Sequence, residues 1–364
     1  MLDRVTAPMI VLLNEACKAS CLFSAAAWLA LAAASPIPAA IVVAASDSLP
    51  EEKAKADLVC DGEDDQIELA ASLAKGRRGK TKIDVNPKTQ QTVECTLNHA
   101  VEWLPGTYHI SATLEVPDAA NCAIRAEGTT LDYQPADGDA VVIRGMNRCR
   151  YNFGTIESSS SGAALCVRPT ARMPALMSFV NFSGLIGTNK RGTGLLVDPS
   201  AENVCVNRFE GTDVLGFERG VYVGAAGTRE GAASTFGKCD TNWFWLSYVR
   251  MCQTCIEESA GGVDCSVWQV NVDASLPGAI AIRAAGGYGK WYVIMGTFTF
   301  EKRNQALVLE PGARHSVFEV HPPLEDFAWE DRSGNDTNIV LSSNRPPFRR
   351  FSELREATSR SASK

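Results

Sequence analysis

The sequence lacks the features that mark nucleic-acid-binding proteins and several common enzyme classes. Its 364 residues carry a formal net charge of −7, and no dense lysine and arginine patch interrupts the middle of the chain. Phosphate backbones bind to such patches, so nucleic acid is not an expected partner. The Gly-x-Ser-x-Gly, Walker and His-Glu-x-x-His motifs are also missing, which leaves serine hydrolase, nucleotide-dependent and zinc protease chemistry without support.

Paired cysteines are scarce as well, although the chain contains twelve cysteines. Only Cys252 and Cys255 have the spacing of a metal or redox pair, and a structural zinc site requires a second pair of ligands. Single cysteines beside apolar positions behave as small hydrophobic residues, whereas disulfide frameworks belong to much smaller domains. We therefore predict buried thiols and no metal site formed by cysteines.

An apolar run near the N-terminus is followed by small residues and a proline. It spans residues 21–35, ahead of Pro36, and its length suits a signal peptide better than a membrane span of about 20 residues. Residues 1–40 are therefore predicted to direct export, which makes the mature protein secreted or bound to the cell surface without a membrane span. Asp3 and Glu15, which precede the run, favour the alternative of a packed N-terminal helix.

A short amphipathic helix is predicted over about residues 64–75. Asp65 and Glu68 have the spacing of a capping box, and Gly76 suits the end of the helix. The acidic residues around Asp65 lack the ligand spacing of an EF-hand, so helix capping explains them better than a calcium loop does. Residues 76–98 are predicted to form an inserted loop or hairpin. The residues expected on the buried face of the helix are Ile67, Ala70, Ala71 and Ala74.

The rest of the chain is organised around an apolar triplet that recurs every 24 to 35 residues. Repeats of that length indicate a solenoid, and the intervals are mostly too short for the four-stranded blades of a propeller. A large aromatic residue stands twelve residues before four of the triplets, which predicts two strand positions in each turn. The triplets begin at Leu165, Leu195, Val221, Ile256, Ile280 and Leu307, and the aromatic residues are Phe153, Phe209, Phe244 and Trp268.

Three segments in the N-terminal third follow a shared pattern. They are the Asp-Gly start of the predicted helix at 61–65, a Leu-Pro-Gly-Thr-Tyr turn at 104–108, and Glu-Gly-Thr-Thr-Leu at 127–131. Together they resemble the entrance of the pectate-lyase-like superfamily. That superfamily comprises right-handed parallel β-helices, among them polysaccharide lyases, glycoside hydrolases, epimerases and phage tailspikes, in which a helix closes the N-terminal end of the solenoid. The match covers about residues 57–131 and departs from the pattern at Ala126, where glycine is common.

The predicted fold is all-β, a right-handed parallel β-helix with an N-terminal capping α-helix. Residues 41–345 are expected to form a single domain, and residues 346–364 a frayed C-terminal tail. The longest interval between triplets predicts a protruding loop near residues 228–238. The resemblance implies a fold more than an activity, because enzymes and non-enzymatic spikes share this entrance.

Side chains alternate across a strand, so the triplets assign directions to their residues. The third residue of each triplet is expected to face inward, and Glu258 is the one polar residue in that row. A carboxylate there requires a hydrogen-bond partner or a raised pKa. Alternatively, the strand ends at Glu257 and Glu258 turns outward, which is the orientation we favour. The outward row is predicted to contain Leu196, Tyr222, Glu257, Ala281 and Val308.

If both glutamates reach the surface, they form a candidate catalytic pair. Paired carboxylates beside arginines suit acid/base hydrolysis of a glycoside, or a calcium-assisted β-elimination in which a base removes a proton from a uronate. An ordinary charged flank of the solenoid is the alternative. The candidate catalytic residues are Glu257, Glu258, Asp213, Arg219 and Arg283, with Tyr222 as a substrate-binding residue.

A second cluster near the C-terminus combines carboxylates, a histidine and aromatic residues within residues 318–332. Such a mixture is typical of a surface that stacks and orients sugars. The Pro-Pro sequence at 322–323 also fits a plain connection into the last coil. The candidate substrate-binding residues of this cluster are Glu319, His321, Glu325, Asp326 and Trp329.

Two functions are open from the sequence. The first is a polysaccharide lyase or glycoside hydrolase that acts on an extracellular glycan, with calcium as the cation that β-elimination would use. The second is a non-catalytic structural or adhesion module, similar to a tailspike or a surface sheath, that associates with itself as a homotrimer. The resemblance implies a polysaccharide partner for the first function, and the missing catalytic motifs favour the second.

Overall fold

A computed structural model describes residues 39–83, 91–224, 239–259, 263–296, 304–322, 327–341, 349–351 and 354. The chain divides into two compact units, residues 1–38 and 39–364. The first unit lies outside the described residues, so the predicted export segment stays a prediction. The loop predicted near residues 228–238 also lies outside them.

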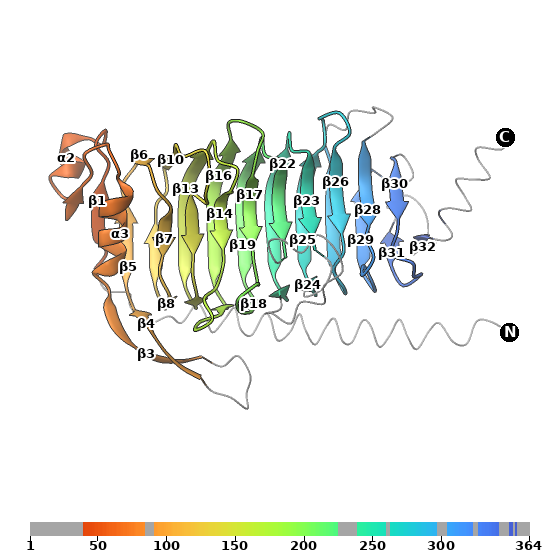
Figure 1. Cartoon of the computed structure of the whole chain (residues 1–364), viewed down its shortest axis with the longest axis horizontal. Helices are drawn as coiled ribbons and strands as arrows, with labels where there is room; N and C mark the ends of the chain where they lie inside the picture. The colour runs from red at the N-terminus through yellow and green to blue at the C-terminus, as the bar shows by residue number, and fades with distance from the viewer. Residues whose placement is uncertain are drawn as a thin grey trace. The chain divides into compact units, whose positions relative to one another are not determined.

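The described residues of the second unit form a parallel β-solenoid, as predicted (Figure 1). In the described part of the chain, most coils contribute strands to three sheets and the last coils to two, and nearly every strand pairs in parallel with the equivalent strand of the next coil. Successive side chains of a strand point to opposite faces of its sheet. One face of each sheet therefore lines the core and the other faces outward.

The bounds of the strands follow the order in each sheet. The fifteen-stranded sheet contains β2 (Leu58–Val59), β1 (Ile41–Ala44), β5 (Ala100–Trp103), β9 (Ala123–Arg125), β13 (Arg150–Ser158), β16 (Phe179–Gly187), β19 (Arg208–Leu215), β22 (Trp243–Arg250), β25 (Val267–Asp273), β27 (Lys290–Met295), β29 (Val317–His321), β31 (Ile339–Leu341) and β32 (Arg349–Arg350), with β10 (Thr129–Tyr133) and β6 (Gly106–Ile110) at one side. The nine-stranded sheet contains β30 (Trp329–Asp331), β28 (Gln305–Leu309), β26 (Ile280–Ala284), β23 (Thr254–Glu258), β20 (Arg219–Val223), β17 (Thr193–Val197), β14 (Ala163–Val167), β11 (Val141–Ile143) and β7 (Leu114–Val116). The eight-stranded sheet contains β24 (Val263–Asp264), β21 (Cys239–Asp240), β18 (Val204–Cys205), β15 (Ala175–Leu176), β12 (Met146–Asn147), β8 (Ala119–Ala120), β4 (Gln91–Leu97) and β3 (Arg77–Ile83).

The helix predicted near the N-terminal end is α3 (Gln66–Ala74), and a one-turn helix, α2 (Pro50–Lys53), precedes it. α3 packs beside β7, the edge strand of the nine-stranded sheet, and beside β1 (Figure 1). The predicted buried face was wrong, because Leu69, Ser72 and Leu73 are buried and Ile67 is exposed. Leu69 and Leu73 lie four residues apart on one side of the helix, and their larger apolar surface determines which side packs inward.

The capping box predicted for α3 is not formed. Asp65 stands at the N-cap without a side-chain capping bond. Its carboxylate instead accepts hydrogen bonds from the backbone N–H groups of Gly62, at 2.9 Å, and His109, at 2.8 Å. Asp65 therefore connects the loop before the helix to strand β6.

The predicted hairpin after the helix is confirmed. Strands β3 and β4 pair antiparallel, from Arg77 opposite Leu97 to Ile83 opposite Gln91. β4 then pairs in parallel with β8 and so continues the eight-stranded sheet. The hairpin extends the edge of that sheet.

A two-residue turn stands directly before the strand of the fifteen-stranded sheet in successive coils. The first residue of the turn has φ between +47° and +58°, and the second is buried except at His99, which is half-buried. The side chain of the second residue can accept a hydrogen bond from the backbone N–H of the equivalent residue in the neighbouring coil. Asn242 Oδ1 accepts from Asn207 N, and Asn207 Oδ1 accepts from Ser178 N, both at 3.0 Å. The residues with positive φ are Asn98, Asn121, Arg148, Met177, Val206, Thr241, Cys265, Tyr288 and His315.

Aromatic rings stack inside the solenoid behind the fifteen-stranded sheet. Centroid distances between neighbouring rings of the stack are 5.0, 3.9, 4.8 and 5.6 Å. Phe153 was predicted to occupy a position equivalent to these rings. It is buried, but it lies two residues further along its strand than that position and pairs with Phe182. The stacked residues are Phe209, Phe244, Trp268, Trp291 and Phe318.

The described part of the predicted C-terminal tail packs against the last coil. β32 pairs antiparallel with β31. Phe351 and Leu354 are buried in the main core, and the Phe351 ring meets the Trp329 ring edge-on at 5.4 Å. These residues therefore cover the C-terminal end of the core.

Candidate functional site

The predicted catalytic residues lie mainly on the outer face of the nine-stranded sheet. Tyr222, Glu257 and Arg283 are direct register partners on β20, β23 and β26. The predicted alignment of the fifth triplet was therefore wrong by two residues, since Ile256 pairs with Ile282. Arg283 takes the outward position that was assigned to Ala281, which is buried in the core.

Four of the predicted residues gather in this cluster. The guanidinium of Arg219 lies 4.5 Å from the centre of the Tyr222 ring. Burial, and then the nearby Glu257 carboxylate, raise the pKa of Tyr222. Arg283 Nε lies 3.7 Å from Glu310 Oε1. The cluster therefore combines a phenol, two arginines and two carboxylates on neighbouring strands.

This cluster is nearly closed to solvent. Tyr222 is 4% exposed and Glu257 is 8% exposed. Tyr222 belongs to a small apolar cluster on the outer face of the sheet, together with Cys166 and Leu196. A polymeric substrate has little access to these groups in this conformation.

Glu258 lies inside the solenoid, so the outward orientation that we favoured was wrong. Ser266 Oγ and Trp268 Nε1 donate to Glu258 Oε1 at 2.6 and 3.0 Å, and Gly286 N donates to Oε2 at 3.3 Å. Burial raises the pKa of the Glu258 carboxyl, while the three hydrogen bonds act in the opposite direction. Glu257 and Glu258 therefore point to opposite faces of the sheet and do not share one surface.

The remaining predicted residues lie elsewhere. Asp213 is on β19 of the fifteen-stranded sheet, where its Oδ1 accepts from Arg250 Nε at 3.0 Å. Trp329 is half-buried and packs against the core. Glu325 and Asp326 lie outside the described residues. Glu319 and His321 are on β29, on the outer face of the fifteen-stranded sheet.

That outer face carries a group of exposed aromatic side chains on β22 and β27. Trp245, Tyr248 and Tyr292 are 48%, 51% and 38% exposed. We call the outward side of β19, β22, β25, β27 and β29 the aromatic face. It presents large apolar rings to solvent among polar side chains, as a ligand surface does.

Polar neighbours hold the rings of the aromatic face in place. The guanidinium of Arg208 lies 4.9 Å from the centre of the Trp245 ring and forms an ion pair with Glu210. The Tyr292 and His321 rings are 5.3 Å apart, and His321 Nε2 lies 3.1 Å from Glu319 Oε1. Each end of the face therefore has an aromatic ring, a basic group and a carboxylate in contact.

Glu319 and His321 were predicted as site residues from the sequence, whereas Trp245, Tyr248 and Tyr292 were not. The signal was present in Trp243-Phe244-Trp245, where aromatic residues occupy both sides of one strand. Phe244 belongs to the internal stack, so its two neighbours point outward. Tyr292 follows Trp291 of the same stack in the same way.

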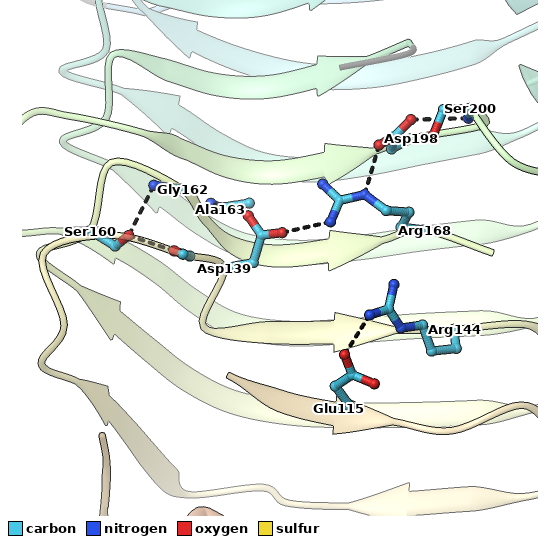
Figure 2. A network of polar contacts seen from close by, with 10 residues as sticks. Glu115, Asp139, Arg144, Ser160, Gly162, Ala163, Arg168, Asp198 and Ser200 are labelled. Atoms are coloured by element: carbon cyan, nitrogen blue, oxygen red, sulfur yellow. Dashed lines mark hydrogen bonds and ion pairs between the residues drawn. The ribbon is translucent and has the colours of Figure 1, made fainter. Parts of the chain in front are cut away.

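A network of ion pairs connects coils on the outer face of the nine-stranded sheet (Figure 2). Arg168 donates through Nη1 to Asp139 Oδ2 at 2.9 Å and through Nε to Asp198 Oδ2 at 2.8 Å. One coil away, Arg144 pairs with Glu115. Asp198 is buried. Both carboxylates that pair with Arg168 belong to neighbouring coils, so these ion pairs connect coils and stabilise the stack.

One group of possible metal ligands occurs in the described part of the chain. Ligand atoms of Cys60, Asp65 and Glu68 lie within 4.8 Å of one another. Burial, followed by the Asp65 and Glu68 carboxylates, raises the pKa of the Cys60 thiol. Calcium requires six to eight oxygen ligands, and two carboxylates with a thiol do not supply that set. The hydrogen bonds of Asp65 give this group a structural role.

The described cysteines agree with the prediction of buried free thiols. Eight of the ten are buried and none of the ten forms a disulfide. Cys252 and Cys255 both lie in the core, and burial raises the pKa of Cys252 to about 12. A thiol with so high a pKa is a poor metal ligand and nucleophile at neutral pH.

Comparisons with family models, with curated proteins and with solved structures found no match. The structure alone establishes the parallel β-solenoid. The resemblance to the pectate-lyase-like superfamily rests on the sequence motif of the N-terminal third and stays an inference. Within the described ranges, no helix has both the length and the apolar character needed to cross a bilayer.

Proposed function

We propose that this protein is a carbohydrate-active β-solenoid that binds an extended extracellular polysaccharide on its aromatic face. One observation carries the proposal: Trp245 and Tyr292 are exposed in one line across neighbouring strands, with hydrogen-bonding side chains between and beside them. The C–H surface of a sugar ring is apolar and packs against such rings, while its hydroxyl groups bond to nearby polar side chains.

Binding without cleavage agrees best with the contacts on this face. A catalytic acid or nucleophile must reach the reacting bond with a suitable protonation state. Three of the four carboxylates of this face, those of Glu210, Asp213 and Glu319, each already face a basic side chain. These ion pairs favour a structural or adhesive binding module.

Polysaccharide cleavage is the second candidate, and the cluster around Glu257 supports it. Arg219, Tyr222, Glu257 and Arg283 lie together on three neighbouring strands. That set offers a carboxylate base and cationic groups for a uronate or a glycosidic bond. Its burial requires that the surface above it open before a substrate could enter.

The test is a panel of neutral and acidic polysaccharides, with and without calcium. Affinity electrophoresis measures binding, and reducing-end and unsaturated-product assays measure hydrolysis and elimination. We expect retention by at least one glycan, and loss of that retention in Trp245→Ala. Cleavage that disappears in Glu257→Gln while binding persists would support the second candidate. No binding to any glycan, together with a stable trimer by light scattering, would show that the protein is a structural module without a glycan ligand.

A further inference from the structure

Five side chains of the aromatic face form one row across neighbouring strands. In the strand register Glu210 pairs with Trp245, Trp245 with Gln269, Gln269 with Tyr292, and Tyr292 with Glu319. Neighbouring strands lie about 4.8 Å apart, so the row runs in the direction in which the coils stack. Trp245 and Tyr292 are separated by two such steps, or roughly 10 Å.

A polymer lying along this row would meet the same sequence of chemical groups. Trp245 offers an aromatic ring, Gln269 an amide that both donates and accepts hydrogen bonds, and Tyr292 a second ring. The carboxylates of Glu210 and Glu319 stand at the two ends of the row. Rings and hydrogen-bonding groups thus alternate at a spacing comparable to one sugar unit and its linkage.

The charges of the aromatic face indicate which glycans fit it. Its five strands carry three cationic side chains and four carboxylates, and none of these side chains is buried. The face has one net negative charge if His321 is counted as neutral and no net charge if it is counted as protonated, so it has no surplus of positive charge in either case. A polyuronate or a sulfated glycan fits it poorly, because binding sites for polyanions have a surplus of positive charge. The cations are Arg208, Arg250 and Lys290, and the carboxylates are Glu210, Asp213, Asp273 and Glu319.

We infer that the ligand of the aromatic face is a neutral glycan whose chain runs along the row from Glu210 to Glu319, parallel to the stacking direction of the coils. The inference rests on the proposed function and assigns its ligand class and direction. A second copy of this chain is a poorer occupant, because the core of a protein interface is depleted of charged residues. Here Arg208, Glu210 and Glu319 stand beside the rings.

The chain offers matched variants for the test. Trp245→Ala, Gln269→Ala and Tyr292→Ala change the row, whereas Tyr248→Ala removes an equally exposed ring on the same strand as Trp245 but outside the row. Tyr288→Ala removes an exposed ring at the turn before β27, outside the strands of the face. The probes are soluble glucan, mannan and xylan as neutral chains, and polygalacturonate and alginate as acidic chains, each titrated by calorimetry at low and high salt.

We expect a neutral chain to bind, with affinity lowered about tenfold or more by Trp245→Ala and by Tyr292→Ala. Gln269→Ala is expected to weaken binding less. Tyr248→Ala, outside the row, should weaken binding clearly less than Tyr292→Ala, Tyr288→Ala should have little effect, and added salt should change the affinity little. A loss in Tyr248→Ala equal to that in Tyr292→Ala would overturn the inferred direction. Binding of acidic chains alone, dependent on Trp245 and weakened by salt, would overturn the neutral ligand and leave the proposed function standing. No binding of any chain would overturn the proposed function itself.

Discussion

Trp268 Nε1 donates a hydrogen bond to Glu258 Oε1 at 3.0 Å inside the solenoid. Trp268 belongs to the internal aromatic stack and Glu258 to the inward row of the nine-stranded sheet. The bond therefore connects the two features that organise the sequence. It also explains how a carboxylate is accommodated in the core, because a buried acceptor without partners is costly.

The first prediction isolates this bond by comparing two equal changes of ring. Trp268→Phe and Trp291→Phe each remove an indole N–H from the same stack, but the Trp291 Nε1 atom has no hydrogen-bond partner. We expect Trp268→Phe to lower the free energy of unfolding by about 1–2 kcal/mol more than Trp291→Phe. Urea denaturation measures both, and equal losses would show that the bond contributes nothing to stability.

The second prediction concerns the pH dependence of stability. Burial raises the pKa of Glu258 above its ordinary value, so the folded state holds a proton that the unfolded state releases at lower pH. The resulting stabilisation is present at low pH and is lost as pH rises through the folded pKa. Because Gln does not titrate, the stability advantage of the native protein over Glu258→Gln should be larger at about pH 5 than at about pH 8. A pH-independent difference would contradict this assignment.

The third prediction compares two ion pairs of Figure 2. Arg168→Ala leaves the carboxylate of Asp198, whose side chain is 2% exposed, without its arginine. We expect a loss of about 1–3 kcal/mol, because an unpaired buried charge is destabilising. Glu115→Ala, in which an exposed carboxylate leaves Arg144, should change stability by less than about 0.5 kcal/mol. Thermal unfolding of both variants in the same buffer decides between these outcomes.

The fourth prediction separates binding from folding on the aromatic face. Trp245 and Tyr292 are 48% and 38% exposed and contact only side chains on the outer face, so their replacement by Ala should lower the free energy of unfolding by no more than about 1 kcal/mol. Circular dichroism melts check this expectation. A large drop in melting temperature would mean that these rings support the sheet, and weaker glycan binding would then have a structural cause.

Much of the fold was accessible from local patterns. The recurring apolar triplets and the aromatic residues before them predicted strands in successive coils, since inward and outward side chains alternate along a strand. The alignment went wrong at Ile280, because Ile280 and Ile282 are both apolar and two residues apart. Only pairing with the neighbouring strand selects Ile282 as the partner of Ile256. The buried face of α3 was wrong for a related reason, since packing partners decide which apolar side faces the core.

The candidate site was less accessible. Sequence brought Tyr222, Glu257 and Arg283 together correctly but could not show that Tyr222 and Glu257 are nearly closed to solvent. It singled out Glu258 as the exception of its row and favoured the wrong orientation. The partners of that carboxylate, Ser266 and Trp268, come from the strand region of another sheet.

By itself, the sequence determined the repeating architecture, because period and alternation are properties of the local chain. The tertiary structure decided the surfaces. Trp245 and Tyr292 stand in one row only because β22, β25 and β27 pair in a particular register. Whether an outward side chain is exposed depends on what packs above it, and residues distant in the sequence determine both.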